Sequence, residues 1–346
     1  MPLLQQIDHN RWYTNFGPLN SKLHQQLNHF FPNRYLTTTA SGTSALELAL
    51  AGLNLAKNSK ILLPALTFPA TVTAALRVGL QPVLADVERL SWQLTPEICL
   101  SYMAKNSIDA VLPVATFGLP LPTEMWDRFF EQTQCPIVID AAGAFGNQSI
   151  STKYPVIFSL HATKNFSSAE GGLIVSANEK LIEQTKRLSN FGIENAGEIS
   201  HNTPGCNAKM SEYHSAIGIA SIDGWPQQKK KRQHLLNWYI KYLKPLGSRV
   251  QLQQGISGQC LSMFNVKLNS NNSLDNIINS LADSGIQTRR WYFPLLSNQP
   301  AFSELEIAAT LTNSEKLRDT LLGLPFHLDL TENDIKTVCR QLDKAS

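Results

Sequence analysis

Two residues of the sequence could together support chemistry on an amine: Lys164, in a polar turn, and Asp140, at the end of an apolar run. The turn lies between short apolar runs at 156–158 and 173–175, which are typical of buried strands. A lysine held beside buried strands loses its proton more easily than a solvated one, and the neutral amine attacks carbonyl groups. The alternative is a solvated surface lysine, the usual state of a lysine in a loop.

The run at 136–142 strengthens the chemical interpretation, because it is a hydrophobic segment that ends near Asp140. Enzymes that use pyridoxal 5′-phosphate (PLP) need such a pair: a lysine that forms an imine with the cofactor, and a carboxylate that keeps the pyridine nitrogen protonated. The turn 41–43 follows a β-rich run at 35–40 and opens a strongly helical stretch, which suits a phosphate group. The alternative for this turn is an ordinary helix cap.

In these segments the sequence resembles the DegT/StrS-type nucleotide-sugar aminotransferases, which are PLP enzymes of fold type I. Four motifs in the family's order carry the resemblance: Ser41-Gly42-Thr43-Ser44-Ala45-Leu46, Asp140-Ala141-Ala142, Ser159-Leu160-His161-Ala162-Thr163-Lys164-Asn165 with Glu170-Gly171-Gly172, and Gly205-Cys206-Asn207-Ala208-Lys209-Met210-Ser211-Glu212. Each motif alone is a weak signal, but the four together extend over most of the chain.

The resemblance implies roles for individual residues, with Lys164 as the catalytic lysine. The implied cofactor-binding residues are Gly42, Thr43, Phe68, Asp140, Ser159, Lys164 and Asn207. Phe68 would cover the pyridine ring, although the sequence alone is equally compatible with a core phenylalanine. Asn207 would reach the cofactor phosphate of the neighbouring subunit, which implies a homodimer with shared active sites.

The candidate substrate contacts are Phe16, Gly17, His161, Arg290 and Trp291. The first two belong to an aromatic arm at 11–18, which either packs on the domain or, as the resemblance implies, lies near the sugar-nucleotide site. His161 is more simply explained as a structural histidine than as a proton-transfer group. Arg290 could bind a carboxylate or phosphate, or it could be an ordinary edge-strand residue in the expected strand 286–292.

Two positions depart from the family pattern. Many members carry Gln or His at the position of Gly143, where the side chain reaches the cofactor's phenolic oxygen, so another group or water must make that contact here. Many members have glycine at the position of Ala169, and we expect alanine to be tolerated unless the backbone needs a positive φ. Neither departure removes the lysine or the carboxylate.

Apolar runs alternate with helical stretches along the first two thirds of the chain, which predicts an α/β fold with a mostly parallel sheet between helices. Ligands of such sheets bind at the carboxyl ends of the strands. We expect a large PLP-binding domain, with its N-terminal arm, at 1–245 and a small C-terminal α+β domain at 246–346. Within them, we expect helices at 19–30, beginning at Ser21, and at 273–284 and 331–345, among others.

Composition excludes several classes of protein. The chain has 346 residues, of which 43% are hydrophobic, and its net charge of +3 gives no reason to expect nucleic-acid or membrane binding. No apolar run approaches the roughly 20 residues that span a bilayer, and no signal peptide is apparent. Five dispersed cysteines show no metal-type spacing, so we expect no metal site and a cytoplasmic location.

The sequence thus predicts an aminotransferase that moves an amino group from an amino acid, L-glutamate in the family, to the keto sugar of a nucleoside-diphosphate sugar. The nearest subgroup suggests a dTDP- or UDP-linked 4-keto-6-deoxyhexose, used for amino sugars of a surface polysaccharide such as a lipopolysaccharide O-antigen, or of a natural product. One alternative is a PLP-dependent sugar dehydratase, expected where histidine replaces Lys164. The other is a non-catalytic regulatory protein that binds nucleotide sugars.

Overall fold

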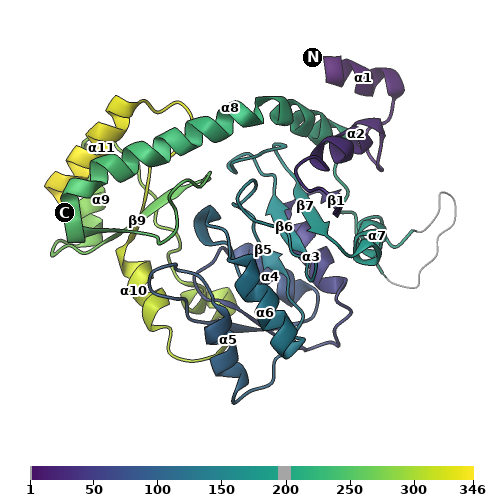
Figure 1. Cartoon of the computed structure of the whole chain (residues 1–346), viewed down its shortest axis with the longest axis horizontal. Helices are drawn as coiled ribbons and strands as arrows, with labels where there is room; N and C mark the ends of the chain where they lie inside the picture. The colour runs from purple at the N-terminus through teal and green to yellow at the C-terminus, as the bar shows by residue number, and fades with distance from the viewer. Residues whose placement is uncertain (1, 194–203) are drawn as a thin grey trace.

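The computed structural model describes residues 2–193 and 204–346 and has one large sheet at its centre (Figure 1). In spatial order the strands are β1 (Tyr35–Thr39), β7 (Gly172–Ser176), β6 (Val156–Ser159), β5 (Ile139–Asp140), β4 (Ala110–Val111), β2 (Lys60–Pro64), β3 (Gln81–Ala85) and β10 (Glu306–Ile307). Single parallel bridges, Val111 with Ile137 and Val114 with Asp140, join the two halves of this sheet. Among these strands β7 runs in the direction opposite to all the others, so the expected mostly parallel sheet is confirmed.

Both faces of the sheet are buried. Neighbouring residues along each strand point to opposite sides, so each strand contributes side chains to both faces. Ile61 and Leu63 pack on one face with the helices α3 (Gly42–Ala51), α4 (Pro69–Arg77) and α7 (Glu179–Leu188). Leu62 packs on the other with α2 (Pro18–Leu27), α5 (Pro96–Met103), α6 (Thr123–Thr133) and the first half of α8 (Glu212–Leu243). The predicted α/β architecture is therefore present, with helices covering the sheet on both sides.

A second, smaller core lies in the C-terminal part of the chain. Its antiparallel sheet has the order β11 (Leu321–Leu324), β9 (Phe264–Leu268) and β8 (Val250–Leu252), and is packed by α9 (Leu274–Asp283) and α11 (Glu332–Ala345). The second half of α8 belongs to this core, so that one long helix joins the two packing units (Figure 1). The domain division at 245/246 stays a prediction; β10, from beyond it, pairs with β3.

The expected helix start at Ser21 is wrong. Helix α2 begins at Pro18, and Gly17 is its N-cap. Both carboxylate oxygens of Glu212 accept hydrogen bonds from backbone N–H groups of its first turn, 2.8 Å from Leu19 and 2.8 Å from Asn20. A distant acidic side chain thus supplies the capping that a local serine was expected to give, and the negative charge also suits the positive end of the helix dipole.

The expected strand at 286–292 is also wrong. Arg289 makes a single antiparallel bridge to Gly323 of β11, and the chain then leaves the small sheet. Trp291 and Tyr292 turn towards the large domain, where both rings lie near Phe68. Aromatic packing between the two units therefore replaces the strand pairing expected for 286–292.

The remaining helices are α1 (Pro2–Asn10), which Figure 1 shows at the end of the molecule beside α2, and α10 (Thr312–Thr320). In the chain described here, no helix combines the length and the apolar character needed to cross a membrane. The helices expected at 273–284 and 331–345 are present as α9 and α11. Their N-caps are Ser273, which accepts from Asn276 N–H, and Thr331, which accepts from Asp334 N–H.

Replacing Glu212 with alanine should remove the cap of α2. Because the carboxylate is 1% exposed and accepts two charge-assisted hydrogen bonds, we expect the free energy of unfolding to fall by roughly 2–4 kcal/mol. Urea denaturation followed by circular dichroism measures this loss. As a control, Glu131→Ala removes an exposed ion pair with Lys153 and should change stability little, so equal losses in the two variants would contradict the assignment.

Candidate active site

Asp140 lies at the carboxyl end of β5 and is only 4% exposed. Its Oδ2 accepts a hydrogen bond of 2.8 Å from Thr71 Oγ1, at the start of α4, and its Oδ1 accepts one of 3.1 Å from Ala142 N. Burial raises the pKa of this carboxyl, while the two hydrogen bonds and the positive charge of Lys164 partly oppose the shift. Among the described residues, no cation lies within ion-pair distance of it, so the charge is buried and incompletely compensated.

Lys164 lies in the turn after β6, the strand next to β5, as the sequence predicted. Burial lowers the pKa of its ammonium group, and the negative charge of Asp140 opposes the shift, so the two groups interact electrostatically. The following residue anchors the turn, because the Asn165 side chain donates 2.6 Å and 2.9 Å hydrogen bonds to the carbonyl oxygens of Phe145 and Cys260. The structure therefore brings the predicted lysine and carboxylate together in one buried region.

The predicted phosphate turn lies against the same strand ends. Ser41 is the N-cap of α3, and its hydroxyl accepts from Ser44 N–H, which leaves the N–H groups of Gly42 and Thr43 free of partners within the helix. A side chain at Gly42 has no room, since its Cβ would lie 2.8 Å from Cβ and 3.1 Å from Oγ of Ser159. The start of α3 thus meets the end of β6 closely enough for both to contact one anion.

An aromatic wall faces this region, and part of it was missed from the sequence. Phe68 is 52% exposed and lies 6.5 Å from the ring of Trp291 and 6.3 Å from that of Tyr292. Phe117 stacks on Tyr292 at 5.4 Å. Burial, and then the charge of Asp140, raise the pKa of Tyr292, which places its hydroxyl within the electrostatic range of the carboxylate. The exposed face of Phe68 is available for a flat ring.

The arm residues lie beside α2 and α7. Gly17 is buried, and a Cβ there would meet the Glu212 carboxylate carbon at 2.6 Å, so this glycine permits the cap of α2. Phe16 is partly buried, with the ammonium group of Lys186 4.9 Å from its ring centre. Both positions have local structural partners, and substrate contact stays a prediction.

The other candidates also have partners within the chain. His161 Nδ1 is 2.9 Å from Thr163 Oγ1, in the same turn. Asn207 is exposed and its side-chain oxygen accepts a 2.9 Å hydrogen bond from Lys209 Nζ. Arg290 lies 3.3 Å from an oxygen of Asp275.

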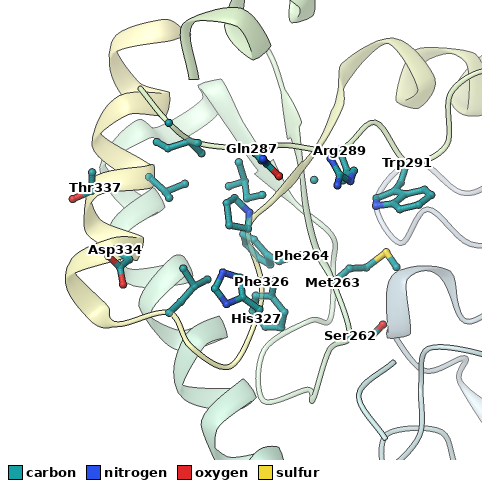
Figure 2. A pocket seen from close by; sticks show the side chains of 17 residues that line it. Ser262, Met263, Phe264, Gln287, Arg289, Trp291, Phe326, His327, Asp334 and Thr337 are labelled. Carbon is teal, nitrogen blue, oxygen red and sulfur yellow. The ribbon is translucent and has the colours of Figure 1, made fainter. Parts of the chain in front are cut away.

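Trp291 also lines a pocket of ≈ 590 Å³ in the C-terminal part (Figure 2). Arg289 lines the same pocket, whereas its neighbour Arg290 points its guanidinium at the ring of Phe293, 3.7 Å away. The predicted substrate residues are therefore not all gathered around Lys164 within one chain.

The exception stated for Ala169 applies, because its backbone has a positive φ. The value of +63° lies in the left-handed region that favours glycine, so alanine here carries some backbone strain. Its carbonyl oxygen accepts a 2.7 Å hydrogen bond from Ala162 N, which helps to hold the turn of Lys164 in this conformation.

The residues present fit PLP. An incompletely compensated buried carboxylate suits a protonated pyridine nitrogen, a lysine with a lowered pKa suits the cofactor aldehyde, and the closely packed start of α3 and Ser159 suit a phosphate. In the two described ranges, no group of three or more His, Cys, Asp or Glu side chains could hold a metal ion.

Replacing Thr71 with valine should weaken binding of PLP by the cofactor-free protein by roughly tenfold, because one hydrogen bond to a buried charge is lost. That bond favours the ionised carboxylate, so its loss raises the pKa of Asp140 further, and affinity should disappear at a higher pH on acidification than in the wild type. Fluorescence titration with PLP across pH measures both effects. Thr133→Val, which removes a hydroxyl from α6, is the control, and unchanged pH profiles in both variants would refute the role of Thr71.

Comparison with known proteins agrees with this geometry. The model of the DegT/DnrJ/EryC1/StrS aminotransferase family matches residues 1–343. The dTDP-4-amino-4,6-dideoxy-D-glucose transaminases of Escherichia coli and Shigella dysenteriae are 29% and 27% identical over 99% and 98% of this chain and 94% and 93% of their own. A Bacillus cereus structure described as a PLP-dependent aminotransferase is 31% identical, with a TM-score of 0.91 over 99% of this chain and 95% of that one.

These matches confirm the expected fold, the PLP cofactor and the aminotransferase class of enzyme. Since the family model extends over nearly the whole sequence, the chain belongs to the DegT/DnrJ/EryC1/StrS aminotransferase family.

Proposed function

We propose that this aminotransferase takes an amino group from L-glutamate and transfers it to the keto sugar of a nucleoside-diphosphate sugar. The observation that carries the proposal is the pairing of the two groups at adjacent strand ends, a buried Asp140 and a Lys164 whose pKa burial lowers. Together they suit removal of a proton next to an amino group, the step that amino transfer requires.

When bound, PLP supplies an aldehyde for the amino group and an electron-withdrawing pyridine ring. Asp140 holds the proton on the ring nitrogen, and Thr71 keeps the carboxylate oriented. Lys164 Nζ, as the neutral amine, would take the proton from Cα of the amino donor and deliver it to the carbon C4′ of the cofactor. In the second half-reaction it would move a proton the opposite way, from C4′ to the sugar carbon that receives the nitrogen. Phe68 covers one face of the ring and shields the reacting atoms from water. Gly42, Thr43 and Ser159 would hold the phosphate, together with Asn207 from a second copy of the chain.

The proposed substrate class follows from the relatives. Two relatives whose names specify a dTDP-linked 4-amino-4,6-dideoxyglucose align along almost the whole chain, which supports a 4-keto-6-deoxyhexose linked to dTDP or UDP. The product would serve as a precursor of a surface polysaccharide or a natural product. The five cysteines are free thiols, which supports a cytoplasmic location.

A homodimer with shared sites is the second part of the proposal. Asn207 is exposed and lies in the segment that forms a single bridge with Asn190, near the start of α3. Ala208, its neighbour, accepts the backbone hydrogen bond of Ala40 at 2.7 Å. An exposed amide at this place could reach the phosphate bound by a second copy of the chain.

The spectrum of the protein with PLP should show a visible band that declines when glutamate is added, as the donor half-reaction consumes the bound aldehyde. Lys164→Ala should lose turnover completely while keeping the fold, because no other described lysine interacts with Asp140. Lys153→Ala, on the surface, is the matched control and should keep normal turnover. Transamination retained by Lys164→Ala would refute the mechanism. A normal band that ignores glutamate but responds to another amino acid would replace the donor.

Mixing two inactive variants tests the shared site. Lys164→Ala and Asn207→Asp chains are each expected to be inactive, the second because a carboxylate would repel the phosphate. If each site combines Lys164 of one subunit with Asn207 of the other, subunit exchange creates sites with both wild-type residues, and part of the activity returns. Light scattering should give twice the mass of one chain, and a failure of the mixture to regain activity would contradict the arrangement.

A further inference from the structure

Ser262 is a buried hydroxyl that the chain itself leaves unused. It lies in the segment that leads into β9 and is 7% exposed, and its Oγ has no hydrogen-bond partner among the described residues. An unpaired buried hydroxyl is unfavourable, so each one calls for an explanation, and a bound group that completes the pairing is one such explanation.

The position of this hydroxyl relates it to the active site. If Gly143 carried a Cβ, that atom would lie 2.9 Å from Ser262 Oγ. Gly143 belongs to the loop that continues from Asp140 at the end of β5, and Gly118, in the loop after β4, packs against it. Phe117, next to Gly118, stacks on Tyr292. Ser262 therefore lies at the same edge of the large sheet as the proposed cofactor site.

Several polar side chains fix the segment that carries Ser262. Asn147 donates 3.0 Å hydrogen bonds to the carbonyl oxygens of Gly118 and Cys260, and its own oxygen accepts from Cys260 N at 2.9 Å. The Asn165 side chain also donates to Cys260 O, and the buried Arg232 donates to Leu261 O at 3.3 Å. Ser262 is thus held in a defined place relative to the turn of Lys164.

Figure 2 shows where this residue lies in the C-terminal part of the molecule. Ser262 is at the end of the pocket that also carries Met263 and Trp291, while Asp334 and Thr337 of α11 are at the opposite end. Trp291 is the residue whose ring lies near Phe68. The end of the pocket with Ser262 is therefore the end that borders the large domain.

From this position we infer that Ser262 donates a hydrogen bond to the phenolic oxygen of bound PLP. The inference rests on the proposed site: there the ring nitrogen has Asp140, the aldehyde has Lys164 and the phosphate has the turn at α3. The phenolic oxygen is the one polar group of the cofactor for which those residues provide nothing. Gly143 has no side chain to offer, and its missing Cβ leaves room for the serine hydroxyl. Ser262 would act as a positioning residue for the ring.

Ser262→Ala separates this role from a structural one. In the cofactor-free protein the substitution removes an unpaired buried hydroxyl, so the thermal midpoint should stay or rise. The dissociation constant for PLP, from fluorescence titration, should increase about fivefold to tenfold, as expected for one hydrogen bond. A donor stabilises the negatively charged phenolic oxygen and so lowers its pKa. Without the donor, the pH midpoint of the visible absorption should move up.

Two further variants sharpen the test. Thr37→Val removes another fully buried hydroxyl that has no described partner, in β1, and should leave the PLP dissociation constant unchanged. Gly143→Ala places a Cβ against Ser262 Oγ, while its other near contacts, to Gly118 at 3.5 Å and 3.6 Å, are ordinary. It should therefore weaken PLP binding as Ser262→Ala does, and add less than about twofold in the Ser262→Ala background, since neighbouring effects are not additive.

The outcomes distinguish this inference from the proposed function. If the wild type shows no PLP band that responds to an amino donor, the proposed function fails. If the wild type behaves as expected and Ser262→Ala changes neither PLP affinity nor the pH midpoint, the inference is overturned, and an ordered water is the partner of the hydroxyl. A loss of affinity accompanied by the same loss in Thr37→Val would also overturn it.

Discussion

Asp140 is a buried carboxylate, and no cation of the described residues lies within ion-pair distance of it; this is the constraint around which the proposed site is arranged. A buried charge is unfavourable unless it is paired, and two hydrogen-bond donors compensate this one only in part. The carboxylate lies at the end of β5, in the middle of the large sheet between β6 and β4. Because its charge is only partly compensated, the position favours a cation, and a protonated pyridine ring would satisfy that preference.

The groups that surround this carboxylate come from opposite ends of the chain. The first half supplies Thr71 and Phe68 through α4, whereas the C-terminal part supplies Tyr292 and Ser262 through segments that leave the small sheet. Helix α8 packs in both hydrophobic cores, and Asn147 bonds the two units directly. Packing of the small unit on the large one is therefore part of the construction of the site.

Features encoded locally could be predicted from the sequence. Short apolar runs predicted the central strands. The helices at 273–284 and 331–345 were also predicted, and their caps, Ser273 and Thr331, lie within a few residues of the turns that they cap. The start of α2 could not be predicted, because the side chain that caps its first turn is Glu212, which lies 193 residues after Leu19 in the sequence. The same holds for the segment around Tyr292, where a strand was expected but the ring instead packs with Phe68 and Phe117. Whether Ala169 has a positive φ could not be decided from the sequence, because alanine carries no signal for it.

Asp140 and Lys164 interact electrostatically, so a change in the charge near Asp140 alters the pKa of Lys164. In the protein alone, burial lowers the pKa of Lys164, but the negative charge of Asp140 raises it and so favours the protonated amine. A pyridinium ion paired with Asp140 neutralises that charge, and the opposing influence on the lysine largely disappears. Lys164 then becomes easier to deprotonate when a cationic ring occupies the site. In the proposed site, the carboxylate that would bind the cofactor would therefore also prepare the base, because both effects come from one buried negative charge.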